Sequence, residues 1–150
     1  MSTKKAKVRR PEKSPAARLK AGRAAYMAEN FAGARDIWLP LAEAGDAEAQ
    51  AWVGSLYANG DGVDINDGTA FGWYLKSAEG GNVQAQSNIG AMYAMGQGVA
   101  QDDEAAVRWF ERAAENGDAH GQFNLAVLLS NGTGVAKDLA NAARWFRAAA

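Results

Sequence analysis

Few side chains in this sequence are of types that catalyse, and none has the partners that catalysis needs. His120 is the one histidine, and acid–base or nucleophilic catalysis would require a second group held beside it in a pocket. The residues 36 and 72 positions earlier are Gln84 and Glu48. Because both are polar, we expect His120 to occupy a solvated surface position. The string Ser2–Lys5 has the S-x-x-K spacing of a serine nucleophile and its lysine, but it lies in a basic segment with no helix to orient the serine. We therefore predict that the protein is not an enzyme.

Candidate sites for a metal ion or a phosphate are equally weak. The acidic run Asp102–Glu104 could bind a cation, but at the start of a helix it is more simply a cap with favourable dipole charges. The chain has no cysteine, so neither a disulfide framework nor a thiolate metal site is available. Gly60–Gly62 lacks the G-K-[ST] sequence and the strand of a phosphate loop. Asn131–Thr133 fits the glycosylation pattern, but we expect it to be only a turn. No cofactor and no metal are predicted.

One unit of 36 residues is repeated through most of the chain. Segments that begin at Asp46, Asn82 and Asp118 align without gaps, and the last stops short at residue 150. Identical residues recur at Gln50, Gln86 and Gln122; Gly60, Gly96 and Gly132; Gly62, Gly98 and Gly134; Val63, Val99 and Val135; Trp73, Trp109 and Trp145; and Ala78, Ala114 and Ala150. Because a fixed period determines the whole architecture, we predict three copies of one structural unit, at residues 46–81, 82–117 and 118–150.

Each unit is expected to fold into two amphipathic helices. The first has apolar residues at i, i+4, i+7 and i+8, on one helical face: Ala49, Val53, Leu56 and Tyr57 in the first unit. The G-x-G-V segment ends this helix because glycine readily adopts positive φ. The second helix follows a capping Asn66, Asp102 or Asp138 and carries an apolar stripe around its Trp. Gly54 and Gly90 lie inside first helices at a cost of about 1 kcal/mol relative to Ala, which predicts close approach of a neighbouring helix.

Residues 15–45 carry a weaker copy of this helix pair. A helix is expected from about Ala16 to Ala28, followed by a short turn and a second helix through Trp38 and Ala42, which keep the 36-residue register with the next unit. Pro40 should kink or end this second helix, because proline removes a backbone donor.

Several residues of the repeat match a known family. The A-x-A-Q start, the G-x-G-V loop and the Trp-aromatic pair followed by Ala, over residues 46–150, resemble the Sel1-like repeat family, relatives of the tetratricopeptide repeats. The resemblance implies an all-α fold, a right-handed α-solenoid of stacked antiparallel helix pairs with three repeats and a degenerate N-terminal pair. It also implies a non-enzymatic scaffold or adaptor that binds another protein. Some disulfide-rich members are described as acting on β-lactams, but their cysteines are absent here.

The inner, concave surface of such a solenoid is the expected binding surface. The positions assigned to it are Ala51, Trp52, Ser55 and Asn59; Ser87, Asn88, Ala91 and Met95; Phe123, Asn124, Val127 and Asn131. The predicted protein-binding residues are Trp52, Ser55, Asn88, Met95, Phe123, Asn124 and Val127. Related repeats hold a ligand backbone with inner-face Asn side chains, which Asn88 and Asn124 match, whereas Trp52 replaces the Asn. Apolar side chains would anchor an extended or helical peptide, because buried aromatics dominate interface energies. Alternatively, Phe123 and Val127 pack on an adjacent repeat.

Charge is distributed unevenly along the chain. Residues 1–20 carry eight Lys/Arg and one acidic residue, a net +7, whereas residues 21–150 carry eight Lys/Arg and sixteen Asp/Glu, a net −8. Residues 1–14 are expected to be a disordered basic tail that could contact nucleic acid or an anionic surface weakly. The tail lacks aromatics to stack on bases and the amphipathic period that enters a membrane. No signal peptide and no membrane-spanning run is recognised, which favours a cytoplasmic location.

The last expected helix ends on Ala148–Ala150 without a cap. A terminal repeat normally needs a polar outer face for solubility, so either the chain is part of a longer array, or a partner or a second copy covers this end. Self-association through the C-terminal repeat, as a regulatory or structural subunit, is therefore the alternative function.

Overall fold

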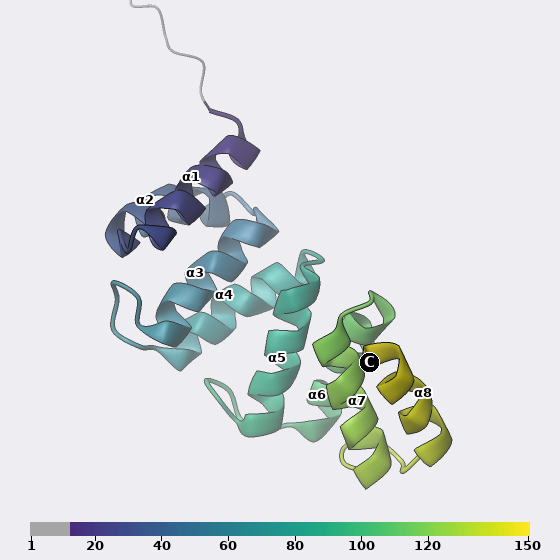
Figure 1. Cartoon of the computed structure of the whole chain (residues 1–150). Coiled ribbons are helices and arrows are strands. Elements are labelled where there is room, and N and C mark those ends of the chain that lie inside the picture. The colour runs from purple at the N-terminus through teal and green to yellow at the C-terminus, as the bar shows by residue number, and fades with distance from the viewer. Residues whose placement is uncertain (1–12) are drawn as a thin grey trace, which may run out of the picture.

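The computed structural model describes residues 13–150, and helices joined by turns and loops make up all the regular secondary structure of this part of the chain (Figure 1). Its helices are α1 (Pro15–Met27), α2 (Phe31–Glu43), α3 (Ala47–Asn59), α4 (Asp67–Glu79), α5 (Val83–Met95), α6 (Asp103–Glu115), α7 (Ala119–Asn131) and α8 (Leu139–Ala149). The all-α class predicted from the sequence is confirmed.

The helices form four antiparallel pairs that stack in chain order into an α-solenoid (Figure 1). Helix α1 packs on α2, α3 on α4, α5 on α6 and α7 on α8, and the second helix of each pair packs on the first helix of the next. Helix α5 also contacts α7, so first helices adjoin along one side of the stack. We call the side formed by α3, α5 and α7 the inner face.

Capping side chains begin these helices where the sequence predicts. The first helices α3, α5 and α7 start after Asp46, Asn82 and Asp118, whose side-chain oxygens accept a backbone N–H at 2.7 to 2.9 Å. The second helices α4, α6 and α8 start after Asn66, Asp102 and Asp138 in the same way, at 2.9 to 3.0 Å. These bonds satisfy backbone donors that a helix start leaves without a partner, and the predicted capping role of Asp102 is confirmed.

The close helix approach predicted at the mid-helix glycines is confirmed, and an aromatic ring is its cause. Tyr74 of α4 lies so close to Gly54 of α3 that a Cβ at residue 54 would be 3.1 Å from the ring, and a Cβ at Gly90 would be 2.7 Å from Phe110. Gly22 of α1 meets Trp38 of α2 even more closely. The first three helix pairs therefore share one contact, a ring of the second helix against the bare backbone of the first.

The fourth helix pair departs from this contact. Ala126 of α7 stands where α5 has Gly90, and Phe146 of α8, the counterpart of Phe110, remains 37% exposed. In the earlier pairs the equivalent rings are nearly covered, with Tyr74 8% and Phe110 3% exposed.

A buried glutamine connects each repeat to the helix before it. Nε2 of Gln50 donates to the carbonyl of Ala42 at 3.1 Å. Gln86 and Gln122 donate in the same way, at 3.2 Å, to the carbonyls eight residues before them. Each of these carbonyls lies in the last turn of the preceding second helix and also accepts the backbone N–H of the glycine three residues later, at 3.0 to 3.1 Å. The bond from the glutamine therefore gives its buried amide a partner and joins the end of one helix to the start of the next. The recurrence of Gln every 36 residues follows from this task.

The N-terminal pair differs from the sequence-based expectation at Pro40. This residue was expected to kink or end its helix, but α2 continues three residues further, to Glu43. Pro40 lies in the last turn and is exposed, and Asp36, whose carbonyl loses its helical donor, is exposed as well. Water can therefore satisfy that carbonyl, and the missing hydrogen bond does not end the helix.

Most of the predicted basic tail, residues 1–14, lies outside the described residues, and so does the S-x-x-K string. Within residues 13–150 no helix is long and apolar enough to cross a membrane.

The glycine–aromatic contact can be tested with two alanine substitutions that differ only in their surroundings. In Gly90→Ala, the new Cβ collides with the buried ring of Phe110, and we expect the free energy of unfolding to fall by about 1–2 kcal/mol, overpacking outweighing the gain in helix propensity. Gly72, exposed within α4, has no neighbouring atom within 4 Å of the position of a Cβ. Gly72→Ala should therefore raise the free energy of unfolding by about 0.5–1 kcal/mol. Urea unfolding measures both. An increase for Gly90→Ala would contradict the close contact.

Candidate functional site

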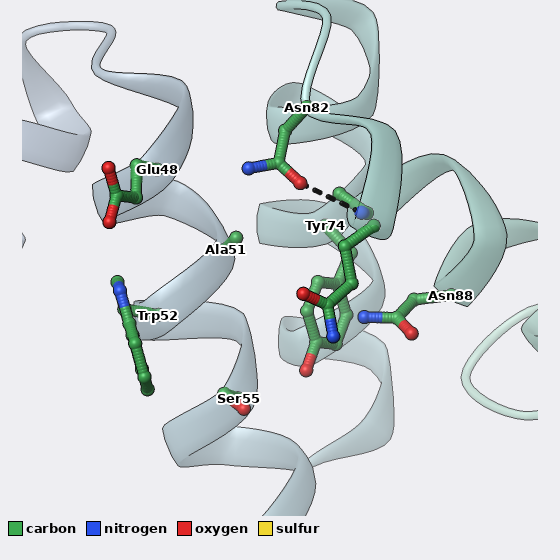
Figure 2. A pocket seen from close by; sticks show the side chains of 9 residues that line it. Glu48, Ala51, Trp52, Ser55, Tyr74, Asn82 and Asn88 are labelled. Atoms are coloured by element: carbon green, nitrogen blue, oxygen red, sulfur yellow. Dashed lines mark hydrogen bonds between the residues drawn. The ribbon is translucent and has the colours of Figure 1, made fainter. Parts of the chain in front are cut away.

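A pocket of about 320 Å³ lies on the inner face between α3 and α5, with Tyr74 of α4 at its base (Figure 2). The α3 wall consists of Glu48, Ala51, Trp52 and Ser55, and the α5 wall of Asn82, Gln84, Ala85 and Asn88. Apart from the Glu48 carboxylate and the Trp52 indole N–H, the polar side-chain groups of this lining are amides and hydroxyls, which can donate to or accept from a peptide backbone.

Trp52 belongs both to this pocket and to the hydrophobic core. One face of its indole stacks on Trp38 of α2, with ring centroids 4.7 Å apart and planes inclined by 15°. Tyr26 of α1 lies 5.7 Å from the same ring. Figure 2 shows the indole edge-on, with its other face turned toward the pocket. The N-terminal helix pair therefore holds the orientation of a side chain that lines the inner face.

The pocket base is polar but uncharged at neutral pH. Burial raises the pKa of the Tyr74 hydroxyl above its usual value, because the phenolate would lose its hydration, while a hydrogen bond with Ser55 acts in the opposite direction. On the α5 wall, the Asn82 oxygen accepts the N–H of Ala85 at 2.9 Å, and its amide nitrogen points toward the α3 wall (Figure 2). Fixed donors and acceptors of this kind can orient a bound segment.

The structure brings some of the predicted binding residues together and separates others. Trp52, Ser55 and Asn88 line the same pocket. Four others lie outside it, on α5 or α7: Met95, Phe123, Asn124 and Val127. Phe123 is 53% exposed and makes an edge-to-face contact with Phe146 of its own helix pair, with ring centroids 5.5 Å apart.

Sequence reasoning missed several residues of the site. Glu48 and Gln84 lie one helical turn before Trp52 and Asn88, so the spacing of four that places side chains on one face could have found them. Tyr74 was assigned to the packing stripe, and its hydroxyl at the pocket base was not foreseen. Ser87, expected on the inner face, is buried and donates to the Asp118 carboxylate at 2.6 Å.

His120 is exposed, as expected for a surface residue. A search of residues 13–150 finds no group of three His, Asp or Glu side chains that could hold a metal ion.

The sequence pattern of the Sel1 repeat matches residues 47–82, 83–118 and 119–150. The chain belongs to the Sel1 repeat family. The Sel1 repeat fold generally mediates protein–protein interaction, and proteins of this family are typically non-catalytic interaction scaffolds. A search of the curated proteins found no match.

Solved Sel1 repeat structures share this fold. The Sel1 repeat protein of Oxalobacter formigenes is 33% identical with a TM-score of 0.84 over 87% of this chain and 54% of its own. The protein c5321, a protective antigen of uropathogenic Escherichia coli with this fold, is 36% identical with a TM-score of 0.84 over 89% of this chain and 30% of its own. The chain thus spans about half of the first relative and less than a third of the second. Helicobacter pylori cysteine rich protein B, at 21% identity and a TM-score of 0.59 over 87% of both chains, shows the fold alone.

The two aromatic residues predicted as anchors should differ in their contribution to the stability of the Sel1 repeats. Because Trp52 stacks in the core, we expect Trp52→Ala to lower the free energy of unfolding by about 2–4 kcal/mol. Phe123→Ala, on a half-exposed ring, should cost about 1 kcal/mol. Chemical denaturation followed by circular dichroism measures both values, and equal losses would show that Phe123 is packed as firmly as Trp52.

Proposed function

We propose that the protein is a non-catalytic scaffold that binds a segment of a partner protein on its inner face, centred on the pocket between α3 and α5. The observation that carries this proposal is the convergence of Trp52, Ser55 and Asn88 from two adjoining first helices on one pocket. Proteins of the Sel1 repeat family are typically non-catalytic interaction scaffolds, which also supports this proposal. The cytoplasmic location expected from the sequence also stays a prediction, which fractionation of cells that produce the protein would test.

The chemistry of the pocket suits a polypeptide. An indole face supplies apolar contact area, and the amides of Gln84 and Asn88 on neighbouring turns of α5 can pair with backbone N–H and C=O groups. The Asn88 side chain makes no hydrogen bond within residues 13–150, so it can bond to a ligand without losing an internal partner.

An alanine substitution at Asn88 tests this function without disturbing the core. Its matched control is Asn141→Ala on α8, which removes another partly exposed amide that does not line the pocket. In cross-linked capture from native lysate, we expect wild type and Asn141→Ala to retain the same partner and Asn88→Ala to bind it about three- to tenfold more weakly, the range of one lost hydrogen bond. If Asn88→Ala retains the partner as well as wild type, the partner does not bind in this pocket.

A second candidate function is self-association through α8, favoured by the exposure of Phe146. The equivalent rings of the two preceding pairs, Tyr74 and Phe110, are 8% and 3% exposed, whereas Phe146 is 37% exposed next to the exposed Phe123. Two adjacent exposed aromatic rings form an apolar surface that a second copy could cover.

Sedimentation of the intact chain over a wide range of concentration tests this candidate. If copies associate through this surface, the mass should rise with concentration in wild type and in the control Met27→Ser, which changes an exposed apolar residue of α1. The mass of Phe146→Ser should stay that of a monomer. A concentration-independent monomer for all three would remove the candidate.

A further inference from the structure

The first full repeat differs from the other two at two positions of the pocket's α3 wall, residues 48 and 52. Where the second and third repeats have Gln84 with Asn88 and His120 with Asn124, the first has Glu48 with Trp52. The members of each pair are four residues apart, so they lie on adjacent turns of the same helical face. A carboxylate and an indole thus stand where the other repeats have an amide or an imidazole followed by an amide.

The carboxylate has only a weak partner within the described chain. Its Oε1 accepts from Arg23 of α1 at 3.4 Å, and both side chains are about half exposed. Charge-assisted bonds of this type are usually 2.7 to 2.9 Å long, so this contact is a loose one. A carboxylate offers further acceptor sites on its second oxygen. Glu48 is also the one carboxylate among the residues that line the pocket.

The indole presents a face suited to a cation. Trp38 covers one face of Trp52, and the other is turned toward the pocket (Figure 2). The face of a tryptophan ring attracts a Lys or Arg cation more strongly than that of any other aromatic side chain. The net −8 of residues 21–150 adds a longer-range attraction for basic segments.

We propose that the pocket between α3 and α5 selects a basic residue of the partner segment, an Arg or Lys whose side chain lies on the free face of Trp52 and whose charged head pairs with Glu48. The occupant is a basic segment of another protein. The amides of Asn88 and its neighbours then bond to the backbone of that segment. This assignment rests on the proposed function and adds which type of residue the pocket recognises.

Short peptides test the assignment in the intact chain. The probes are acetylated and amidated alanine-rich peptides of one length with a single central Arg, Lys or Gln. NMR titration of the indole N–H of Trp52 and the side-chain amide of Asn88 gives the affinities. We expect the Arg and Lys peptides to bind about tenfold more tightly than the Gln peptide, and this preference should shrink as salt is added.

Two matched carboxylate variants separate the pocket from general electrostatics. Glu48 and Glu104 each occupy the second position of a helix, in α3 and α6. Glu48→Gln should remove the preference for Arg over Gln, whereas Glu104→Gln should leave it unchanged. Equal binding of the three peptides by wild type, or equal losses in the two variants, would overturn the selection of a basic residue.

A further variant distinguishes the source of the basic segment. In the intact chain, Lys4, Lys5, Lys7, Arg9 and Arg10 are replaced by Gln. If this variant binds the Arg peptide as wild type does, the pocket is open to a partner, as proposed. If it binds the peptide about tenfold more tightly, the chain's own basic tail competes for the pocket, and the assignment to a partner is overturned. Loss of partner capture by Asn88→Ala without any preference for Arg would preserve the proposed function and reject only this inference.

Discussion

The contact between an aromatic ring and a glycine backbone sets the spacing of each helix pair. A ring from the second helix lies where a side chain of the first would otherwise stand, at Gly54 beneath Tyr74 and at Gly90 beneath Phe110. The glycines cost helix propensity, and the buried aromatic area offsets that cost. Because the two helices approach so closely, the hydroxyl of Tyr74 reaches through to the inner face, where it forms the base of the pocket. The same contact therefore supports both the packing and the candidate site.

The pocket and the N-terminal helix pair depend on each other. Trp52 presents one face to the pocket and the other to Trp38, and Tyr26 touches the same aromatic cluster while its hydroxyl donates to Asp61 at 2.7 Å. A ligand on the free face of Trp52 would thus contact a ring that the degenerate pair holds in place. This pair departs from the repeat in its turn and at Pro40, yet it keeps the aromatic–glycine contact at Trp38 and Gly22. Its retention of that contact explains how a divergent sequence still supports the first full repeat.

The fold could be predicted from sequence because its determinants are local and periodic. A capping Asp or Asn and a left-handed Gly each act within a few residues, so their spacing of 36 carries the helix boundaries directly. The candidate site was only partly predictable. Trp52 and Asn88 were found from the helical period, but the stack on Trp38 and the turn of Phe123 toward Phe146 depend on how rings pack between helices. No pattern within one helix encodes those contacts, and the position of Pro40 relative to solvent likewise became clear only in three dimensions.

The stacking of each helix mainly on its immediate neighbours has a consequence for how the molecule opens. Interfaces that join only consecutive segments make stability nearly a sum of pairwise steps along the chain, and they favour rapid folding because few distant segments must meet. The steps are unequal here. The fourth pair has Ala126 in place of a glycine, and its Phe146 is partly exposed, whereas the first three pairs each bury a ring on a glycine. Amide hydrogen exchange should therefore be graded along the chain, with α7 and α8 opening first while the pocket between α3 and α5 keeps its walls in place through partial unfolding.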